Sequence, residues 1–325
     1  MIVGQDRAVE QFAAAWATRK LHHAWLLAGP KGVGKASFAH AAARRVLADA
    51  AGAPLDLPGI ESDDDHPIVK FVEAGSHPDM RRLERLVNEK TGNLNRSIKV
   101  EQVRELAEFL SLSAALSAWR VVIIDSVDDL EPSGANALLK MLEEPPPNTI
   151  FFLVSHAAGR LLPTIRSRCR RLHFQALEDE AMTSILEAQG PALSAAERKQ
   201  VVAASFGSAA RALAFAELGL AKLEGAATAI LRQGDPTNVR RSELAAELGK
   251  KTAADCYTAF LDLAPSLIAR EARSLEDSRR ERALDAYAKA RELAAAAPRV
   301  SLDPAATVFQ MGGILAEVAD PSLKP

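Results

Sequence analysis

The sequence predicts a doubly wound α/β domain over residues 1–175, followed by a small helical domain over 176–219 and an all-helical domain over 220–325. Short apolar runs, typical of buried parallel strands, alternate with segments of helical period up to about residue 175. A glycine-rich loop lies between the first of these runs and the helix that follows it. Beyond Gln175 the strand-like runs stop, whereas the helical periodicity continues.

Composition and charge exclude several classes of protein. The formal net charge is −2, so the chain as a whole has no basic signature for nucleic acid or an anionic membrane. The two cysteines, Cys169 and Cys256, form no C-x-x-C pair and cannot build a thiolate metal site alone. The N-terminal residues contain no apolar signal core, and no run approaches the roughly 18 apolar residues of a membrane span. We therefore expect a cytoplasmic protein with no membrane contact.

Three segments establish the start of the α/β domain. Residues 5–19 place apolar side chains on one face of a helix, and residues 24–29 form a short apolar run that ends in glycine. Residues 36–50 again have helical period. The glycine loop therefore lies between a strand and a helix, which is the context that a phosphate-binding loop requires.

The next segment, 51–67, contains three prolines and an acidic cluster, and we expect an irregular insertion there. Asp125 stands at the carboxyl end of a β-branched run that is typical of a buried parallel strand. The other elements predicted in this domain are helices at 101–112 and 133–144 and strands at 120–126, 149–155 and 169–174. Helices at 178–189, 194–204 and 208–219 follow, and then a longer helical set extends to about residue 319.

The stretch GPKGVGKASF, residues 29–38, matches most of the phosphate-loop pattern G-x-x-x-x-G-K-[ST]. Gly29, Gly32 and Gly34 permit the turn that directs backbone N–H groups toward an anion at a helix N-terminus. Lys35 is placed to meet the β and γ phosphates of a nucleotide. A glycine turn that binds no ligand is the alternative interpretation of the same residues.

The hydroxyl that normally follows the loop lysine and ligates magnesium is missing, because Ala36 stands there. Ser37 has a hydroxyl, but it lies one residue further on, about 100° round the helix. We expect the Ser37 side chain to point away from the loop.

The strand that ends at Asp125 carries the acid that would hold magnesium, but Ser126 follows it where an NTPase of this type has Glu. We expect Asp128 and Asp129 to lie in a different direction from the strand end. The residue types that hold a metal and orient a nucleophile are thus absent, which argues against hydrolysis.

Five arginines fall between Arg160 and Arg171, around the sequence TIRSRCRRL. They form either a solvated basic turn or a site from which one arginine serves a phosphate outside this chain. Arginine suits the second role because its fork stays charged and pairs bidentately with phosphate oxygens.

Taken together, these motifs resemble the AAA+ clamp-loader ATPases of DNA replication, and most closely the δ′ (delta-prime) subunits of bacterial DNA polymerase III. The resemblance covers the α/β domain in order, continues into the small helical domain with GSAARAL (207–213), and beyond about residue 220 rests on position and character alone. The matching stretches are VGQ (3–5), LHHAWLLAGPKGVGK (21–35), HPD (77–79), VVIID (121–125), NALLKMLEEPP (136–146), FFLVS (151–155) and RSRC (166–169).

The resemblance implies roles for particular residues. Arg168 matches the arginine finger that reaches the ATP site of a neighbouring motor subunit. Ser155 matches the first sensor and Arg211 the second. Val3 and Gly4 would lie near an adenine if a nucleotide binds.

Departures from the family pattern suggest which kind of member this is. Motor subunits (γ/τ) carry Thr and Glu where this chain has Ala36 and Ser126. They also carry a four-cysteine zinc module in the segment occupied here by residues 50–78, which contain no cysteine. Many δ′ relatives keep this module too, so its absence indicates that no zinc binds here rather than which kind of subunit this is. We therefore expect no zinc, and we interpret His66 and His77 as polar loop residues rather than metal ligands.

The resemblance thus implies an AAA+ domain, a lid domain and an oligomerising collar domain over the three ranges given above. The chain is expected to be a non-hydrolysing stator that works with γ/τ motor subunits, the δ subunit, the sliding clamp and primed DNA. We expect weak ATP or ADP binding at most, and poor DNA binding by the chain alone. An ATP-hydrolysing motor subunit with an unorthodox site, and a small-molecule P-loop kinase, remain as alternatives.

Overall fold

The computed structural model describes residues 2–18, 21–53, 55–87, 94–218, 221–250, 253–300 and 302–319. The chain divides into two compact units, Met1–Glu178 and Asp179–Pro325. The predicted boundary between lid and collar, at 219/220, lies outside the described residues, so that division stays a prediction. No helix among the described residues is long and apolar enough to cross a membrane.

The first unit is built on a five-stranded sheet in the order β2-β3-β4-β1-β5, in which every neighbouring pair is parallel. The predicted parallel α/β architecture is confirmed. The edge strand β2 was not predicted, because only Leu83 of its MRRLE sequence is buried and the strand lacks an apolar run. The strands are β1 (Ala24–Ala28), β2 (Met80–Glu84), β3 (Arg120–Asp125), β4 (Thr149–Ser155) and β5 (Arg170–His173).

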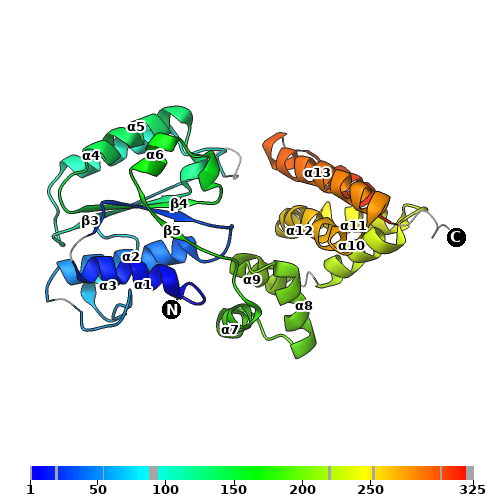
Figure 1. Ribbon diagram of the computed structural model, residues 1–325, viewed down its shortest axis with the longest axis horizontal. Coiled ribbons are helices and arrows are strands. Elements are labelled where there is room, and N and C mark those ends of the chain that lie inside the picture. The colour runs from blue at the N-terminus through cyan, green and yellow to red at the C-terminus, as the bar shows by residue number, and fades with distance from the viewer. Residues whose placement is uncertain are drawn as a thin grey trace. The chain divides into compact units, whose positions relative to one another are not determined.

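Helices cover both faces of this sheet (Figure 1). Along β1, Trp25 and Leu27 belong to one core cluster and Leu26 and Ala28 to the other, as alternating strand side chains require. One face carries α1 (Asp6–Ala17), α2 (Lys35–Ala50) and α3 (Pro67–Glu73), and the other carries α4 (Val100–Ser111), α5 (Pro132–Glu143) and α6 (Pro163–Ser167). Short 3₁₀ segments, η1 (Val127–Asp129) and η2 (Ala158–Arg160), follow β3 and β4.

The second unit is helical throughout its described residues, as the sequence beyond Gln175 predicts. Ser194 caps α8 through a capping box with Glu197. The Oγ of Ser208 accepts a hydrogen bond from the backbone N–H of Arg211 at 3.4 Å and so caps the start of α9. The helices are α7 (Asp179–Gln189), α8 (Ala195–Ser205), α9 (Ala209–Leu218), α10 (Ala221–Gln233), α11 (Val239–Leu248), α12 (Ala254–Ala272), α13 (Asp277–Val300) and α14 (Pro304–Ala316).

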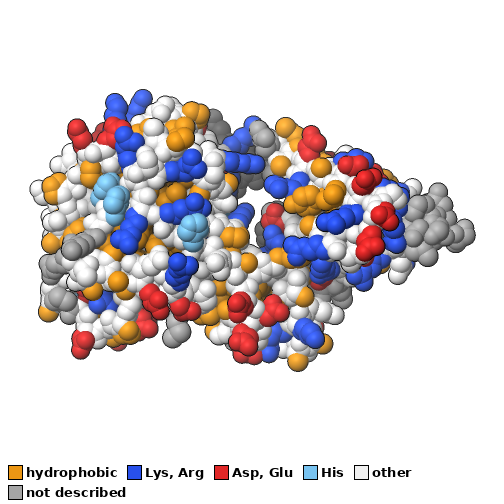
Figure 2. Space-filling view, in the orientation of Figure 1, with side chains coloured by type: hydrophobic (Ala, Val, Ile, Leu, Met, Phe, Trp, Pro, Cys, Tyr) orange, Lys and Arg blue, Asp and Glu red, His pale blue; other side chains and the backbone are white. Residues whose placement is uncertain are grey.

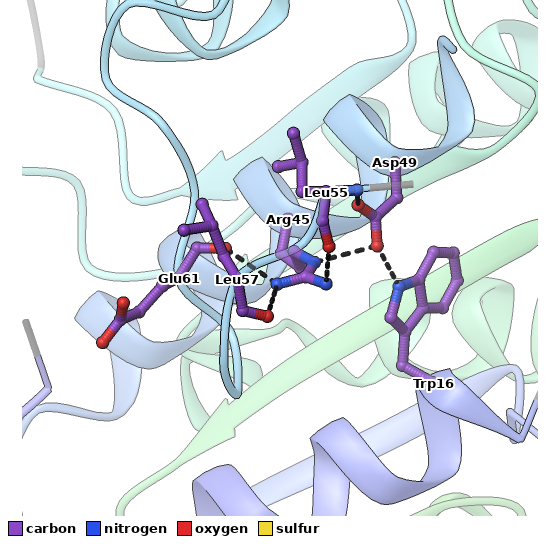
Figure 3. A network of polar contacts seen from close by, with 6 residues as sticks. All are labelled: Trp16, Arg45, Asp49, Leu55, Leu57 and Glu61. Carbon is purple, nitrogen blue, oxygen red and sulfur yellow. Dashed lines mark hydrogen bonds and ion pairs between the residues drawn. The ribbon is translucent and has the colours of Figure 1, made fainter. Parts of the chain in front are cut away.

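The predicted irregular insertion is anchored to α2 by a buried polar network (Figure 3). The Arg45 guanidinium donates to Asp49 at 2.8 Å, and Asp49 also accepts from the indole N–H of Trp16 at 2.6 Å. Three backbone carbonyls of the insertion accept from Arg45 at 2.7–3.1 Å, those of Leu55, Leu57 and Glu61. Side chains of α2 thus order this irregular segment.

The HPD motif has a structural role next to the sheet. The Asp79 carboxylate is buried and accepts hydrogen bonds from three consecutive backbone N–H groups at 2.6–2.8 Å, those of Ala115, Leu116 and Ser117. Burial opposes ionisation of Asp79, but the three donors outweigh it and lower the pKa of the carboxyl. Asp79 therefore fixes the loop that leads from α4 into β3.

We predict that Asp79→Ala lowers the free energy of unfolding by about 2–3 kcal/mol, because it leaves buried N–H donors without an acceptor. The loss should be constant near neutral pH. The loss should shrink as the pH falls below about 4, the pKa of Asp in the unfolded chain. Asp79 becomes protonated as the pH approaches its lower native pKa, and its carboxylate then no longer stabilises the native chain. Urea unfolding at several pH values measures both effects. The matched control is Asp63→Ala, which removes an exposed carboxylate with one backbone donor; equal losses in the two variants would contradict the assignment.

Candidate functional site

The predicted nucleotide residues gather at the carboxyl edge of the sheet. In the strand register, Ala28 of β1 lies beside Ser155 of β4, and Asp125 of β3 lies beside Val154. The glycine loop leaves β1 at this same edge and leads into α2. The edge is where ligands bind in open parallel sheets.

The loop glycines are required by the backbone. Gly32 and Gly34 have φ angles of +79° and +96°, which side-chain-bearing residues rarely adopt. A Cβ added at Gly29 would lie 2.2 Å from the carbonyl oxygen of Phe174, so only glycine fits beside the residue that follows β5. Helix α2 begins at Lys35, immediately after this turn, and its N-terminus faces the loop.

Lys35 lies folded back onto its own loop. Its side chain is buried, and its ammonium donates to the carbonyl oxygens of Gly29, at 2.8 Å, and Pro30. Burial lowers the pKa of Lys35 to about 8, although the carboxylates of Asp128 and Asp125 act in the opposite direction. A phosphate in the loop would offer this ammonium a stronger, charged acceptor than the carbonyls.

The magnesium ligands expected of such a site are not provided by these residues. Ala36 in the first turn of α2 has no hydroxyl, and Ser37 is exposed to solvent. Asp125, at the end of β3, accepts a hydrogen bond from the guanidinium of Arg82 at 2.9 Å, and Arg82 also contacts Glu84 at 3.0 Å. The carboxylate that would hold a metal is thus already paired with a fixed cation, so the residues present do not fit magnesium.

The expectation that Asp128 lies in a different direction from the strand end is wrong. The 3₁₀ turn η1 directs the Asp128 carboxylate toward the end of β4, where it accepts from the Ser155 hydroxyl at 3.0 Å. It also accepts from the backbone N–H of His156 at 2.7 Å. Asp128 was missed because the sequence gives no sign of the tight turn after β3. It fixes Ser155, which the resemblance assigns as the first sensor.

Asp129, by contrast, pairs with Arg85 at 3.3 Å. Every carboxylate between Asp125 and Asp129 therefore has a partner within the chain. Among the described residues, no group of three or more His, Cys, Asp and Glu side chains could hold a metal ion. His66 accepts from the backbone N–H of Ile68 at the start of α3, and His77 accepts from that of Asp79, so both stabilise loops.

The N-terminal VGQ stretch is tied to the loop by Gln5. The Gln5 side-chain amide donates to the carbonyl of Val33 at 3.2 Å and to that of Gln175 at 2.9 Å. Gly4 adopts a positive φ of +71° next to Val3. Val3 and Gly4, assigned to the adenine, are thus held against the phosphate loop by a residue whose bonding the sequence did not predict.

Arg168 lies on the surface of the first unit, at the end of α6. Its guanidinium pairs with Glu143 of α5 at 2.7 Å and donates to the carbonyl of Thr164 at 2.9 Å. A third of the side chain, 33%, is exposed. The neighbouring Cys169 is partly buried, and this burial raises the pKa of its thiol to about 12 and keeps it protonated.

Arg211, assigned as the second sensor, belongs to the other compact unit. It lies on α9 and its guanidinium donates to the hydroxyl of Ser266 on α12 at 3.4 Å.

On the face drawn in Figure 2, Lys and Arg side chains are spread over both units among hydrophobic and acidic ones.

A family model described as "DNA polymerase III, delta subunit" matches residues 4–178. The chain belongs to this family. The matched range contains the phosphate loop, Asp125, Ser155 and Arg168, whereas Val3 and Arg211 lie outside it.

Curated relatives agree with the family model. Over 150 residues the chain is 39% identical to DNA polymerase III subunit delta' of Pseudomonas aeruginosa, covering 45% of this chain and 41% of that protein. It is 36% identical to the delta' subunit of Escherichia coli, covering 51% and 46%. It is also 31% identical to the tau subunit of Bacillus subtilis, covering 58% and 31%. The matches thus span less than half the length of these relatives.

These matches confirm the resemblance to DNA polymerase III subunits that the motifs predicted. A solved structure of a gamma subunit-related protein from Thermotoga maritima aligns over 95% of this chain and 99% of that chain, with a TM-score of 0.46 at 16% identity. The family match ends at residue 178, where the first compact unit also ends.

We predict that Lys35 makes stability rise with pH between about 8 and 10.5. Its native pKa lies below the ordinary value of 10.5, so the unfolded chain binds more protons in this window. Urea unfolding at pH 8, 9 and 10 should show the native chain gaining stability relative to Lys35→Met as the pH rises. Lys31→Met, an exposed change in the same loop, is the control. If the free energies of unfolding of the native chain and Lys35→Met differed by the same amount at every pH, the burial of this ammonium would be contradicted.

Proposed function

We propose that the chain is a δ′-like stator subunit of the bacterial DNA polymerase III clamp loader. In this role it assists the ATP-driven loading of the sliding clamp onto primed DNA in the cytoplasm. Its partners are γ/τ motor subunits and the δ subunit, with the clamp and primed DNA contacted within the assembly. The family match and the delta' relatives support this assignment.

The chain's own site is proposed to be defective in hydrolysis. Hydrolysis of a nucleotide by a P-loop protein needs a metal held by a hydroxyl and an acid, and a group that orients water. Here Ala36 lacks the hydroxyl, Asp125 is paired with Arg82 at 2.9 Å, and Ser126 follows it in place of Glu. The intact glycines and Lys35 still leave a phosphate cradle, for which we propose weak ATP or ADP binding and no zinc.

Arg168 is the residue proposed to act on a neighbouring subunit. The observation that carries the proposal is the contrast between two charged residues, Asp125 and Arg168. The carboxylate of Asp125 is neutralised inside the chain, while Arg168 remains on the surface with a third of its side chain exposed. Its bonds to Glu143 and Thr164 hold the guanidinium in one orientation. A surface ion pair of this kind is worth about 0–1 kcal/mol, so a phosphate can replace Glu143 as its partner.

A γ/τ-like motor subunit of the same complex is the second candidate. The observation in its favour is the length of the match, because the B. subtilis tau subunit covers 58% of this chain against 45% for the P. aeruginosa delta' subunit. That function requires the isolated chain to hydrolyse ATP. Ala36 and the Arg82–Asp125 pair oppose it.

We predict that Arg168→Ala sharply reduces ATP turnover in a clamp loader reconstituted with its clamp and primed DNA. An arginine supplied in trans contributes roughly 10³–10⁵ to the rate at the site it serves. Arg168→Lys should recover little, because lysine keeps the charge but not the planar fork. Turnover is measured as phosphate release by complexes whose assembly has been verified by size-exclusion chromatography.

Arg166→Ala is the matched control, since Arg166 lies in the last turn of α6, two residues before Arg168, and is exposed. It should leave turnover unchanged. Equal turnover in the native and Arg168→Ala complexes would reduce this arginine to a solvated surface residue and remove the proposed role in trans.

A further inference from the structure

Arg82 pairs with Asp125 at the candidate nucleotide edge, but the proposed function gives it no part in binding a ligand. It lies on β2, at the edge of the sheet, and reaches the neighbouring strand to contact Asp125. One of its nitrogens bridges two carboxylates, those of Asp125 at 2.9 Å and Glu84 at 3.0 Å. The side chain is 45% exposed and that of Asp125 19%, so the pair is half open to solvent at the end of the strand.

The strand register explains why this arginine reaches the edge. β2 pairs with β3 so that Glu84 lies beside Asp125, and Arg82 is two residues earlier on the same face. The adjacent Arg81 points to the opposite face, where its guanidinium packs 4.5 Å from the centre of the Phe109 ring. Two neighbouring arginines thus have different surroundings, and only Arg82 faces the site.

Arg82 contacts Asp125, the carboxylate that would hold the metal cation of a P-loop site. Phosphates in the loop would lie near the carboxylates of Asp125 and Asp128, which already influence the buried Lys35. Unscreened carboxylates there would repel a polyphosphate. A divalent metal normally removes this repulsion, but Ala36 supplies no hydroxyl ligand and Asp125 is already paired.

We propose that Arg82 takes the place of the divalent metal, so that the loop binds a nucleoside diphosphate or triphosphate without magnesium. This inference rests on the proposed function in one respect, that the site does not hydrolyse its nucleotide. The guanidinium neutralises Asp125, and its remaining N–H donors can bind a phosphate oxygen directly. A metal–nucleotide complex would bring a second cation against Arg82, so magnesium should give no advantage.

Arg82 as a substitute for the metal and Arg82 as an ordinary ion pair of an edge strand lead to different expected results. An exposed pair that serves only the fold is worth about 0–1 kcal/mol, and its loss has no reason to alter nucleotide binding. A cation that replaces a metal makes affinity depend on Arg82 and makes the metal dependence change when Arg82 is removed. Nucleotide affinity with and without metal therefore separates the two roles.

The experiment measures the binding of a fluorescent ADP analogue to the full chain, once in EDTA and once in magnesium. For the native chain we expect the same dissociation constant, within about twofold, under both conditions. Arg82→Ala should weaken binding in EDTA by roughly tenfold or more, the scale of a lost hydrogen bond to a charged group. Magnesium should restore part of that loss, because Asp125 is then free to face a metal.

Two controls make the result specific. Arg81→Ala removes the neighbouring arginine and should bind the analogue as the native chain does under both conditions. Adding Asp125→Asn to Arg82→Ala should abolish the restoration by magnesium. Unfolding curves for all variants verify that the domain remains folded.

Three outcomes would overturn the proposal. These are native binding that requires magnesium, Arg82→Ala binding equal to native binding in both conditions, and no binding by the native chain at millimolar analogue. None of these outcomes affects the proposed role of Arg168, which is tested by ATP turnover at a neighbouring subunit. If the Arg168 experiment failed, the metal dependence of nucleotide binding by this chain could still be tested independently.

Discussion

The parallel register of β1, β3 and β4 is the constraint on which the candidate site depends. It places the phosphate loop, Asp125 and Ser155 at one edge of the sheet, since Ala28 lies beside Ser155 and Asp125 beside Val154. The register itself follows from strands that are buried on both faces, where a shift of one residue would exchange the two cores. Packing of apolar residues therefore decides where the polar chemistry lies.

Within that edge, contacts inside the chain occupy the groups that a hydrolytic site would leave available. Asp125 pairs with Arg82, Asp129 pairs with Arg85, and Asp128 accepts from Ser155. The fold thus has the loop and strand ends of a candidate nucleotide site, while its carboxylates serve as structural acceptors. Such a site is suited to bind a ligand without hydrolysing it. The ATP hydrolysis in which Arg168 is proposed to take part would then occur in a neighbouring subunit.

Most of the first unit could be predicted from the sequence because its central strands are apolar runs and its loop glycines have a fixed spacing. The edge strand β2 could not, since Leu83 is its only buried residue. The direction of Asp128 was predicted wrongly because a 3₁₀ turn of three residues leaves no periodic signal. Arg82 was missed for a related reason: its role depends on a pairing between strands that are distant in the sequence.

We propose above all that the candidate nucleotide site of this chain does not hydrolyse ATP. The most direct test measures phosphate release from ATP with magnesium by the purified chain alone, with Lys35→Ala as the reference for contaminating activity. We expect equal phosphate release by the two proteins. Release by the native chain that clearly exceeds that of Lys35→Ala would contradict it and identify a working motor site.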